Sequence, residues 1–232
     1  MNRLTKKFAQ LRECISYVVM ENKWKDRSKY GSWPESAVMH KPVDISALEN
    51  LYMEPYTRIQ PGLRLISFTG KFIVKKFAAC GANLLVVTGN HTPTVGVSQF
   101  SLGQSHINDN EKDILVEEGA WVGANTTLLA GAHIGRCAVI GACSMVNREI
   151  PPYAVAVGCP AKVIATTFTL EQAIKNEELL FKPEDRLSES YLRELFAEKY
   201  AGLRAIGTDE IKDGDKERYE KIREMVEKVK SL

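Results

Sequence analysis

The stretch "VEEGAWVGANTTLLAGAHIGRCAVIGACSMV", residues 116–146, carries an aliphatic residue at every sixth position. The series is Val116, Val122, Leu128, Ile134, Ile140 and Val146. An α-helix turns about 100° per residue, so a period of six spreads these side chains around the helix instead of gathering them on one stripe. Six is a multiple of the strand period, but strands are usually about three to ten residues long. The pattern therefore predicts short strands separated by regular corners.

A second series supports the corners, because a small residue follows four positions after each aliphatic residue: Ala120, Thr126, Ala132, Ala138 and Ser144. Glycines also follow three of the aliphatic residues, at Gly123, Gly135 and Gly141, where a tight turn would need freedom in φ. Three such units make one coil, which stacks Val116 under Ile134, Val122 under Ile140 and Leu128 under Val146. This describes a parallel β-helix of triangular section.

Upstream, the same period is looser. Ile59 and Leu65 are in phase, and Phe68, Val74, Cys80 and Val86 restart the series after a slip at "SFTGKF". We attribute the slip to a short insertion at Thr69 and Gly70. Val86 and Val116 are separated by a multiple of six, so we expect the segment between them to leave the β-helix and return in phase.

Length and composition fit one domain with extensions, because 232 residues of which 44% are hydrophobic can enclose a sizeable core. A net charge of +2 is too small to indicate a nucleic-acid-binding protein. We see no membrane-spanning apolar run and no signal peptide, so we expect a cytoplasmic protein. The five cysteines lack metal-type spacing, and we expect reduced thiols packed as small hydrophobic residues.

Charge density divides the chain into three parts: an N-terminal helical extension (1–44), a β-helix domain (45–168) with an ejected loop at about 92–112, and a C-terminal helical extension (169–232). Leu4, Phe8, Leu11, Ile15 and Val18 recur at helical spacing in the first part. Its basic face is either solvated or a peripheral contact with an anionic membrane. In the last part we expect Thr169 with Gln172, and Ser188, to cap helices. Tyr219, Ile222, Val226 and Val229 have heptad spacing, which suits a docking helix or a short coiled contact.

The repeat, followed by "REIPPYAVAVGCPAKVI", closely resembles the hexapeptide-repeat acyltransferases, within them the group of maltose, galactoside and virginiamycin acetyltransferases. The resemblance covers about residues 50–168. It implies a mainly β fold, a left-handed parallel β-helix, which is an exception to the right-handed crossover rule. It also implies a homotrimer that holds acetyl-CoA between neighbouring subunits. The two flanks lie outside the resemblance and are similar to versions found beside polysaccharide biosynthesis genes.

The segment "TGNHTPTVG" places His91 at the exit from the coil. Acetyl transfer from a thioester to a hydroxyl needs a base, and imidazole titrates near working pH. In similar enzymes a histidine in this context is the general base, and the alternative is a loop histidine that caps a turn. His106 either contacts the acceptor or is a solvated loop residue. Related β-helix trimers bind zinc through closely spaced histidines, but His91, His106 and His133 lack a close pair in the sequence, so we expect no metal.

The resemblance also suggests cofactor-binding residues. Ala124 and Ala142 match positions where the coil backbone meets the pantetheine arm of acetyl-CoA, although repeat geometry alone also demands small residues there. Asn147 and Arg148 take the place of a threonine and a lysine, and Lys162 takes that of a basic residue near the nucleotide phosphates. Asn147 and Cys143 depart from the family's usual threonine and glycine.

For the acceptor we expect contacts from Asn90, Phe100, His106, Asn108 and Trp121. The polar loop from Thr92 to Lys112 offers donors and acceptors for sugar hydroxyls, and Phe100 can stack on an apolar sugar face. The alternative for the loop is a trimer-locking arm, and the alternative for Trp121 is packing at the trimer interface.

Taken together, the residues and the resemblance predict a trimeric acetyl-CoA-dependent O-acetyltransferase that acts on a sugar or glycan precursor. N-acetylation of an amino sugar is one alternative, because an amine acceptor also needs a base. A non-catalytic β-helix scaffold is another, although a scaffold would require neither His91 nor the basic residues Arg148 and Lys162.

Overall fold

The structure is a computed structural model that describes residues 7, 8, 12 and 24–230. The predicted N-terminal helix and its basic face therefore lie almost wholly outside the described residues, as does Cys14. No helix in the described part of the chain is long and apolar enough to cross a membrane.

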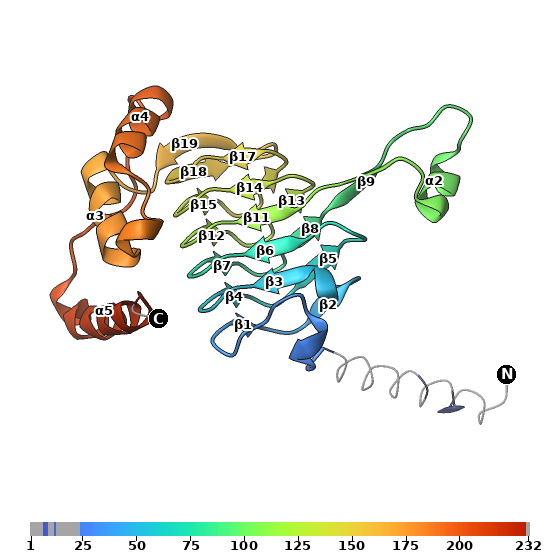
Figure 1. The fold of residues 1–232 in the computed structure, drawn as a ribbon, viewed down its shortest axis with the longest axis horizontal. Coiled ribbons are helices and arrows are strands. Elements are labelled where there is room, and N and C mark those ends of the chain that lie inside the picture. The colour runs from blue at the N-terminus through green and yellow to red at the C-terminus, as the bar shows by residue number, and fades with distance from the viewer. Residues whose placement is uncertain (1–6, 9–11, 13–23, 231–232) are drawn as a thin grey trace.

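Short strands form three sheets that lie as the faces of a prism, and all of their pairings are parallel except that of β18 with β19 (Figure 1). Sheet I contains β1 (Val38–Met39), β4 (Arg58–Ile59), β7 (Ala79–Cys80), β12 (Trp121–Val122), β15 (Val139–Ile140), β18 (Ala154–Val157) and β19 (Lys162–Thr166). Sheet II contains β3 (Leu51–Met53), β6 (Phe72–Val74), β11 (Ile114–Val116), β14 (His133–Ile134) and β17 (Glu149–Ile150). Sheet III contains β2 (Val43–Ile45), β5 (Leu63–Ile66), β8 (Leu85–Val87), β13 (Thr127–Leu129) and β16 (Met145–Val146). The chain visits the sheets in the order I, III, II, which produces one coil per circuit.

The predicted stacking of aliphatic residues is confirmed. Val116 pairs with Ile134, Val122 with Ile140, and Leu128 with Val146 in parallel register. All six side chains are buried, and so are the five small residues at the corners. The ladder begins before residue 45, since β1 and β2 pair in parallel with β4 and β5.

The glycines in the repeat have a different role from the one predicted. Positive φ occurs three positions after each of the first five aliphatic residues, at Gly119, Asn125, Gly131, Cys137 and Cys143. Gly123, Gly135 and Gly141 do not have positive φ. They are needed because the next coil is too close: a Cβ on Gly123 would lie 2.5 Å from the backbone nitrogen of Ala142. Close approach of the next coil, rather than turn conformation, therefore selects glycine there: backbone atoms are too close at Gly123 and Gly135, and the Val157 side chain is too close at Gly141.

Two further expectations are wrong. Phe68 does not continue the inward series, because its side chain is 60% exposed. Phe72 and Val74 resume the core instead, so the corner after β5 is longer than an insertion of Thr69 and Gly70 alone. Of the described cysteines, Cys80 and Cys137 are buried as predicted, but Cys143 and Cys159 are exposed free thiols.

The predicted excursion leaves sheet III after β8 and returns to sheet II at β11 (Figure 1). It consists of β9 (Gly89–His91), helix α2 (Gln99–Ser105) and β10 (Asp109–Glu111). Strands β9 and β10 are antiparallel and form a ribbon that carries α2 away from the body. The backbone nitrogen of Lys112 donates to the carbonyl oxygen of Thr88 at 2.8 Å, which closes the base of the ribbon.

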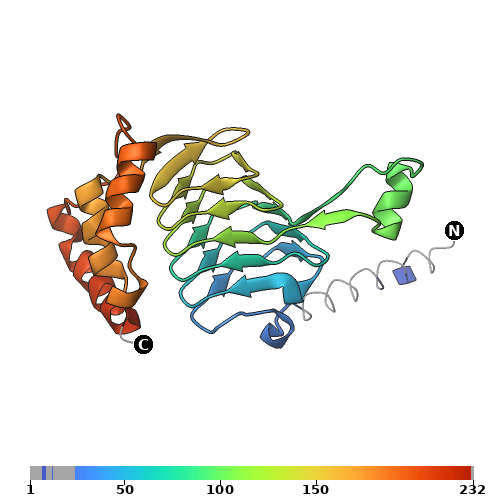
Figure 2. The same ribbon diagram turned by 45° about the horizontal axis from the view of Figure 1, so that its top comes forward.

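The C-terminal part is helical and lies on the opposite side of the β-helix from the excursion (Figures 1 and 2). It contains α3 (Leu170–Leu180), α4 (Glu189–Lys199) and α5 (Lys216–Lys230), and the short 3-10 helices of the chain are η1 (Arg27–Lys29), η2 (Leu48–Asn50), η3 (Pro183–Asp185) and η4 (Asp213–Asp215). The predicted capping box of Thr169 and Gln172 and the cap by Ser188 are both present. In α5, Val226 and Val229 are buried, whereas Tyr219 and Ile222 are 40% and 56% exposed, so only half of the predicted heptad surface is covered.

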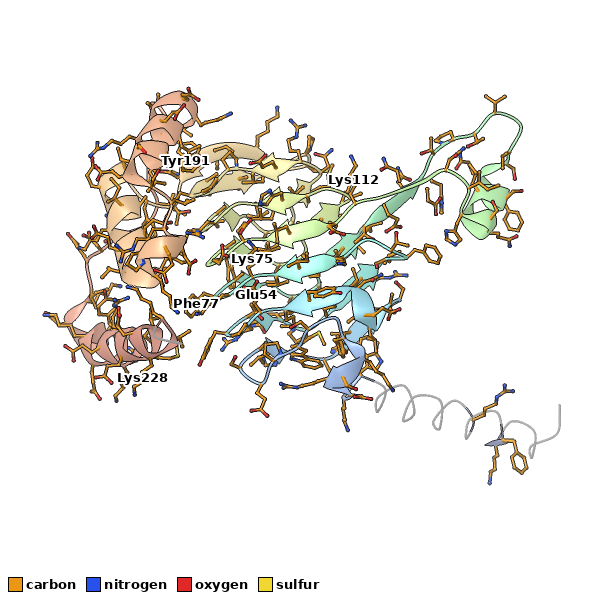
Figure 3. All side chains as sticks on the ribbon, viewed as in Figure 1. Glu54, Lys75, Phe77, Lys112, Tyr191 and Lys228 are labelled. Carbon is orange, nitrogen blue, oxygen red and sulfur yellow. The ribbon has the colours of Figure 1, made fainter. Side chains whose placement is uncertain are left out.

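Arg136 joins these helices to the corner between sheets II and I. Its guanidinium donates to Glu177 in α3 at 3.0 Å and lies 3.4 Å from Glu118. It also stacks over the ring of Phe181 at 4.2 Å. Figure 3 shows that this side of the β-helix, where Lys75 and Phe77 lie, faces the helices.

Candidate active site

The two faces of the ribbon carry different chemistry. His91 is the register partner of Asp109, and Asn90 is the register partner of Asn110. Because side chains alternate across a strand, His91 and Asp109 lie on one face and the two asparagines on the other. We call these the histidine face and the amide face.

On the histidine face, one carboxylate joins two imidazoles. Nδ1 of His91 lies 2.6 Å from Oδ1 of Asp109, and Nδ1 of His106 lies 2.7 Å from Oδ2 of the same carboxylate. The two rings are 5.9 Å apart between centroids. The carboxylate is 13% exposed, while the imidazoles are 38% and 40% exposed, so the histidines remain accessible.

Because Asp109 is ionised, Nδ1 of each imidazole carries a proton. Hydrogen bonds from His91 and then from His106 lower the pKa of the Asp109 carboxyl below its usual range. An ionised carboxylate only accepts hydrogen bonds, so each imidazole donates from Nδ1. For a neutral imidazole, this leaves the lone pair on Nε2, the form that a general base needs.

Nε2 of His91 points toward a glycine in the helix above it. A Cβ built on Gly103 would lie 3.7 Å from this nitrogen, which is an ordinary van der Waals distance. Glycine in a helix interior costs about 0.5–1 kcal/mol relative to alanine. Gly103 therefore leaves room beside the one nitrogen of His91 that carries no hydrogen bond to the described residues.

A second acidic residue fixes the ribbon to the corner after β5. Glu111 accepts hydrogen bonds from the hydroxyl of Thr88 at 2.7 Å and from the backbone of Gly70 at 2.9 Å. Its carboxylate lies over Gly89, where an added Cβ would meet Oε1 at 1.7 Å. A side chain at position 89 would therefore displace the Glu111 carboxylate from its bonds to Thr88 and Gly70.

The amide face borders a cavity of about 380 Å³ at the corner between sheets III and II. Asn90, Asn110 and Lys112 supply its polar lining, and Val87, Leu129 and Ala130 supply its apolar lining. Neither carboxamide forms a hydrogen bond with another residue that the structure describes. Figure 3 places Lys112 at the root of the ribbon.

The predicted cofactor residues fall on different corners of one chain. Ala124 and Ala142 lie at the corner between sheets I and III, after β12 and β15. Asn147 and Arg148 lie at the corner between sheets III and II, after β16, which is the corner that the excursion leaves. Lys162 begins β19 and is exposed. A single chain therefore does not bring the five residues together.

The predicted acceptor residues are also dispersed. Phe100 on α2 is 76% exposed, and Asn108 donates to the hydroxyl of Thr94 within the excursion at 3.1 Å. Trp121 is 45% exposed on sheet I, a different face of the prism from the excursion. Two residues of the predicted acceptor set lie beside His91. Asn90 precedes it in the chain, and the centroid of the His106 ring lies 5.9 Å from that of His91.

Sequence reasoning missed two residues of this site. Asp109 was seen only as loop polarity, although its spacing of three from His106 was a usable signal. Phe68 was assigned to the core, but its ring stacks on His106 at 4.5 Å with an interplanar angle of 8°.

His91 and His106 form a close pair in the structure, although their separation in the sequence predicted none. With Asp109 they bring three ligand atoms within 4.8 Å of one another. Both Nδ1 atoms are engaged by the carboxylate itself, an arrangement that hydrogen bonding explains. His133 lies elsewhere, on β14, where its Nε2 is 2.9 Å from Glu117.

Known proteins share the repeat and the fold. Residues 113–148 match the family model described as bacterial transferase hexapeptide (six repeats). A dTDP-3-amino-3,6-dideoxy-α-D-galactopyranose 3-N-acetyltransferase from Aneurinibacillus thermoaerophilus is 49% identical over 49 residues, which are 21% of this chain and 26% of that protein. Bifunctional GlmU proteins are also among its curated relatives, and the matched segments cover between 11% and 30% of the length of these proteins.

Among solved structures, a hexapeptide-repeat acetyltransferase from Vibrio cholerae O1 biovar eltor, complexed with acetyl coenzyme A, aligns with a TM-score of 0.52 and 19% identity over 65% of this chain and 78% of that one. A maltose O-acetyltransferase from Clostridium difficile 630 aligns with a TM-score of 0.54 and 20% identity over 62% and 73% of the two chains. These comparisons confirm the resemblance to hexapeptide-repeat acyltransferases and the parallel β-helix fold.

Proposed function

We propose that this protein is an acetyl-CoA-dependent O-acetyltransferase whose acceptor is a hydroxyl of a sugar or glycan precursor. The observation that carries the proposal is the geometry of His91: its Nδ1 is held by Asp109 at 2.6 Å, and its Nε2 faces the space left by Gly103. The same ring environment would be unnecessary in a scaffold protein.

The reaction follows from this geometry. Nε2 of His91 removes the proton of the acceptor hydroxyl while the oxygen attacks the thioester carbonyl carbon. The tetrahedral intermediate then collapses, the carbon–sulfur bond breaks, and the imidazolium returns the proton to the thiolate of CoA. Asp109 stabilises the imidazolium that forms between these steps, as the aspartate does in a Ser-His-Asp triad.

We place the donor along the corner between sheets III and II. The cavity on the amide face has carboxamides and an apolar floor, a lining that suits the amides and methylenes of a pantetheine arm. Asn147 and Arg148 lie on the same corner farther along the β-helix axis, and Arg148 offers positive charge for phosphate. The cavity lies at the root of the ribbon on the opposite face from His91, so the thioester of a donor bound there would reach Nε2 around the edge of the ribbon.

The proposal includes a homotrimer of left-handed β-helices. Ala124, Ala142 and Trp121 lie on other faces of the prism than His91. A neighbouring subunit would bring them to the excursion of the first, so that each donor site is built from two chains.

The deciding experiment is a thiol-release assay with acetyl-CoA against a panel of sugars and the matching amino sugars. His91→Ala should lose about 10²–10⁴-fold in turnover. His40→Ala, at an exposed histidine outside the site, should retain it. Turnover with amino sugars but not with sugars would show that the enzyme is an N-acetyltransferase and not an O-acetyltransferase. N-acetyl transfer is the activity named for the relative from Aneurinibacillus thermoaerophilus. No thiol release with any acceptor would favour the scaffold.

A further inference from the structure

The Asp109 carboxylate is held at both ends. Nδ1 of His91 bonds one oxygen at 2.6 Å and Nδ1 of His106 bonds the other at 2.7 Å. The terminal torsion of an aspartate is broad and nearly two-fold, so a single hydrogen bond restrains its plane poorly. Two donors on opposite oxygens define that plane and, through it, the orientation of the His91 ring.

His106 is itself held in place by two independent features. Its backbone adopts the left-handed conformation, with φ of 52°, and its N–H bonds the carbonyl of Leu102 to end helix α2. Its ring stacks on Phe68 at 4.5 Å with nearly parallel planes. Non-glycine residues adopt positive φ uncommonly, so a specific local structure maintains this conformation.

Phe68 projects from the corner after β5, the point at which the hexad series slips. A buried network fixes that corner: Asn50 donates to the hydroxyl of Ser67 at 2.6 Å, and Ser67 donates to the carbonyl of Gly70 at 2.8 Å. Gly70 in turn donates to Glu111 on the ribbon. The corner is thus fixed by hydrogen bonds at Ser67, before Phe68, and is tied to the ribbon at Gly70, after it, while the Phe68 side chain remains 60% exposed.

We propose that Phe68 and His106 are positioning residues that hold the Asp109 carboxylate in the plane in which it accepts the Nδ1 proton of His91. This inference rests on the proposed role of His91 as the base. It makes the extra residues of the corner after β5 part of the active site: the irregularity in the repeat places the ring that supports the second histidine.

The kinetic test compares loss and retention of each contact. His106→Leu removes the hydrogen bond, whereas His106→Asn keeps an N–H donor near the position of Nδ1. Phe68→Ala removes the stack and Phe68→Tyr keeps it. We expect His106→Leu and Phe68→Ala to lower kcat by roughly tenfold or more, since a catalytic group misplaced by 1 Å costs about 10²-fold. The KM for acetyl-CoA should not change. The conservative variants should stay within about threefold of wild type, a small part of that cost.

Matched controls are His40→Ala and Tyr191→Ala, an exposed histidine and a half-exposed aromatic residue outside the site. If His106→Leu fails to fold, Phe68→Ala is the decisive variant. The Phe68 side chain is mostly exposed to solvent, so we expect its removal to leave the fold intact. A rise in acceptor KM with kcat preserved in Phe68→Ala would make Phe68 a sugar platform and overturn the positioning role.

A spectroscopic readout needs no substrate. Nitrogen-15 NMR at about pH 9, above the ordinary titration range of imidazole, reports which ring nitrogen carries the proton. We expect the Nδ1–H tautomer of His91 in the wild type, and a mixture of tautomers in His106→Leu and Phe68→Ala. An unchanged tautomer in both variants would overturn the proposal even if His91 is essential. Conversely, full turnover in His91→Ala would overturn only the role of His91 as the base. The tautomer of His91 could still be compared between the wild type and the His106→Leu and Phe68→Ala variants. Loss of turnover on chelation and its recovery with Zn²⁺ would instead identify the three residues as a metal site.

Discussion

Nδ1 of His91 and Oδ1 of Asp109 lie 2.6 Å apart across the two strands of the ribbon. The two residues are eighteen positions apart in the chain, and antiparallel pairing makes them direct neighbours. We expect Asp109→Asn to retain the fold and to lower kcat by between about 10-fold and the about 10⁴-fold seen when a triad aspartate is replaced. The neutral amide neither fixes one tautomer nor stabilises the imidazolium. Steady-state kinetics in both substrates check this, and a change confined to either KM would contradict it.

The space beside Nε2 of His91 can be filled from Gly103. A methyl group there lies at an ordinary contact distance of 3.7 Å, so Gly103→Ala should retain turnover and stabilise helix α2 by about 0.5–1 kcal/mol. Gly103→Leu should obstruct the acceptor and lower its kcat/KM by about 10²-fold. Thermal unfolding and kinetics on the pair measure the two effects. Equal activity of both variants would show that the acceptor reaches His91 from another side.

Thiol reactivity provides a test of the donor path. Burial raises the pKa of the Cys80 and Cys137 thiols to about 12, so at pH 8 both remain protonated and out of reach of reagents. Cys143 and Cys159 are exposed. We expect iodoacetamide to modify only these two among the described cysteines, as read by peptide mass spectrometry. Cys143 follows Ala142, so CoA should slow its modification. Equal rates of modification with and without CoA would show that the donor does not contact the corner between sheets I and III, which carries Ala142 and Cys143.

Trp121 separates two accounts of the assembly. We expect light scattering to report three times the chain mass of 25.9 kDa. Because Trp121 lies on sheet I and is 45% exposed, a role in the neighbouring subunit's site predicts that Trp121→Ala keeps the trimer and raises acceptor KM. Dissociation of the variant would instead make Trp121 an interface residue. A monomeric wild type that still transfers acetyl groups would refute the two-chain donor site.

Arg136 should be the main polar tie between the β-helix and the C-terminal helices. Its partner Glu177 is 2% exposed and also accepts from the Tyr153 hydroxyl at 2.7 Å. Arg136→Met leaves that carboxylate buried without its cation, which typically costs about 3–5 kcal/mol. Chemical denaturation should show this loss, and adding Glu177→Gln should recover part of it. A loss below about 1 kcal/mol would place the helices' attachment in apolar packing instead.

The hexad period was sufficient to predict the β-helix because each coil repeats the same physical requirement. An inward aliphatic residue and a small corner residue recur whatever the neighbouring coils contain, so Val122 and Ile140 identify each other as partners from spacing alone. The period also predicted where the chain departs from the coil, at His91. Glycine roles were misassigned because sequence does not distinguish a turn at Asn125 from a close backbone approach at Gly123.

The polar site was less predictable because its contacts join separate segments. Asp109 reaches His91 only through ribbon register, and Phe68 reaches His106 only because the corner after β5 lies beside the ribbon. Neither relationship has a period. His91 was identified through the resemblance, whereas the network that orients its ring depends on tertiary structure.

The hydrogen bond from Lys112 to Thr88 closes the ribbon at its root, so the coil continues from β8 to β11 much as if the excursion were absent. Loop-closure entropy grows slowly, by about 0.6 kcal/mol for each doubling of length. The stretch between these two residues is therefore an exchangeable cassette. Its length and sequence can diverge at little expense to the β-helix, provided that a replacement keeps Gly89 and Glu111 at its base. Grafts from other proteins of this fold, joined at Thr88 and Lys112, offer a direct way to transplant acceptor preference.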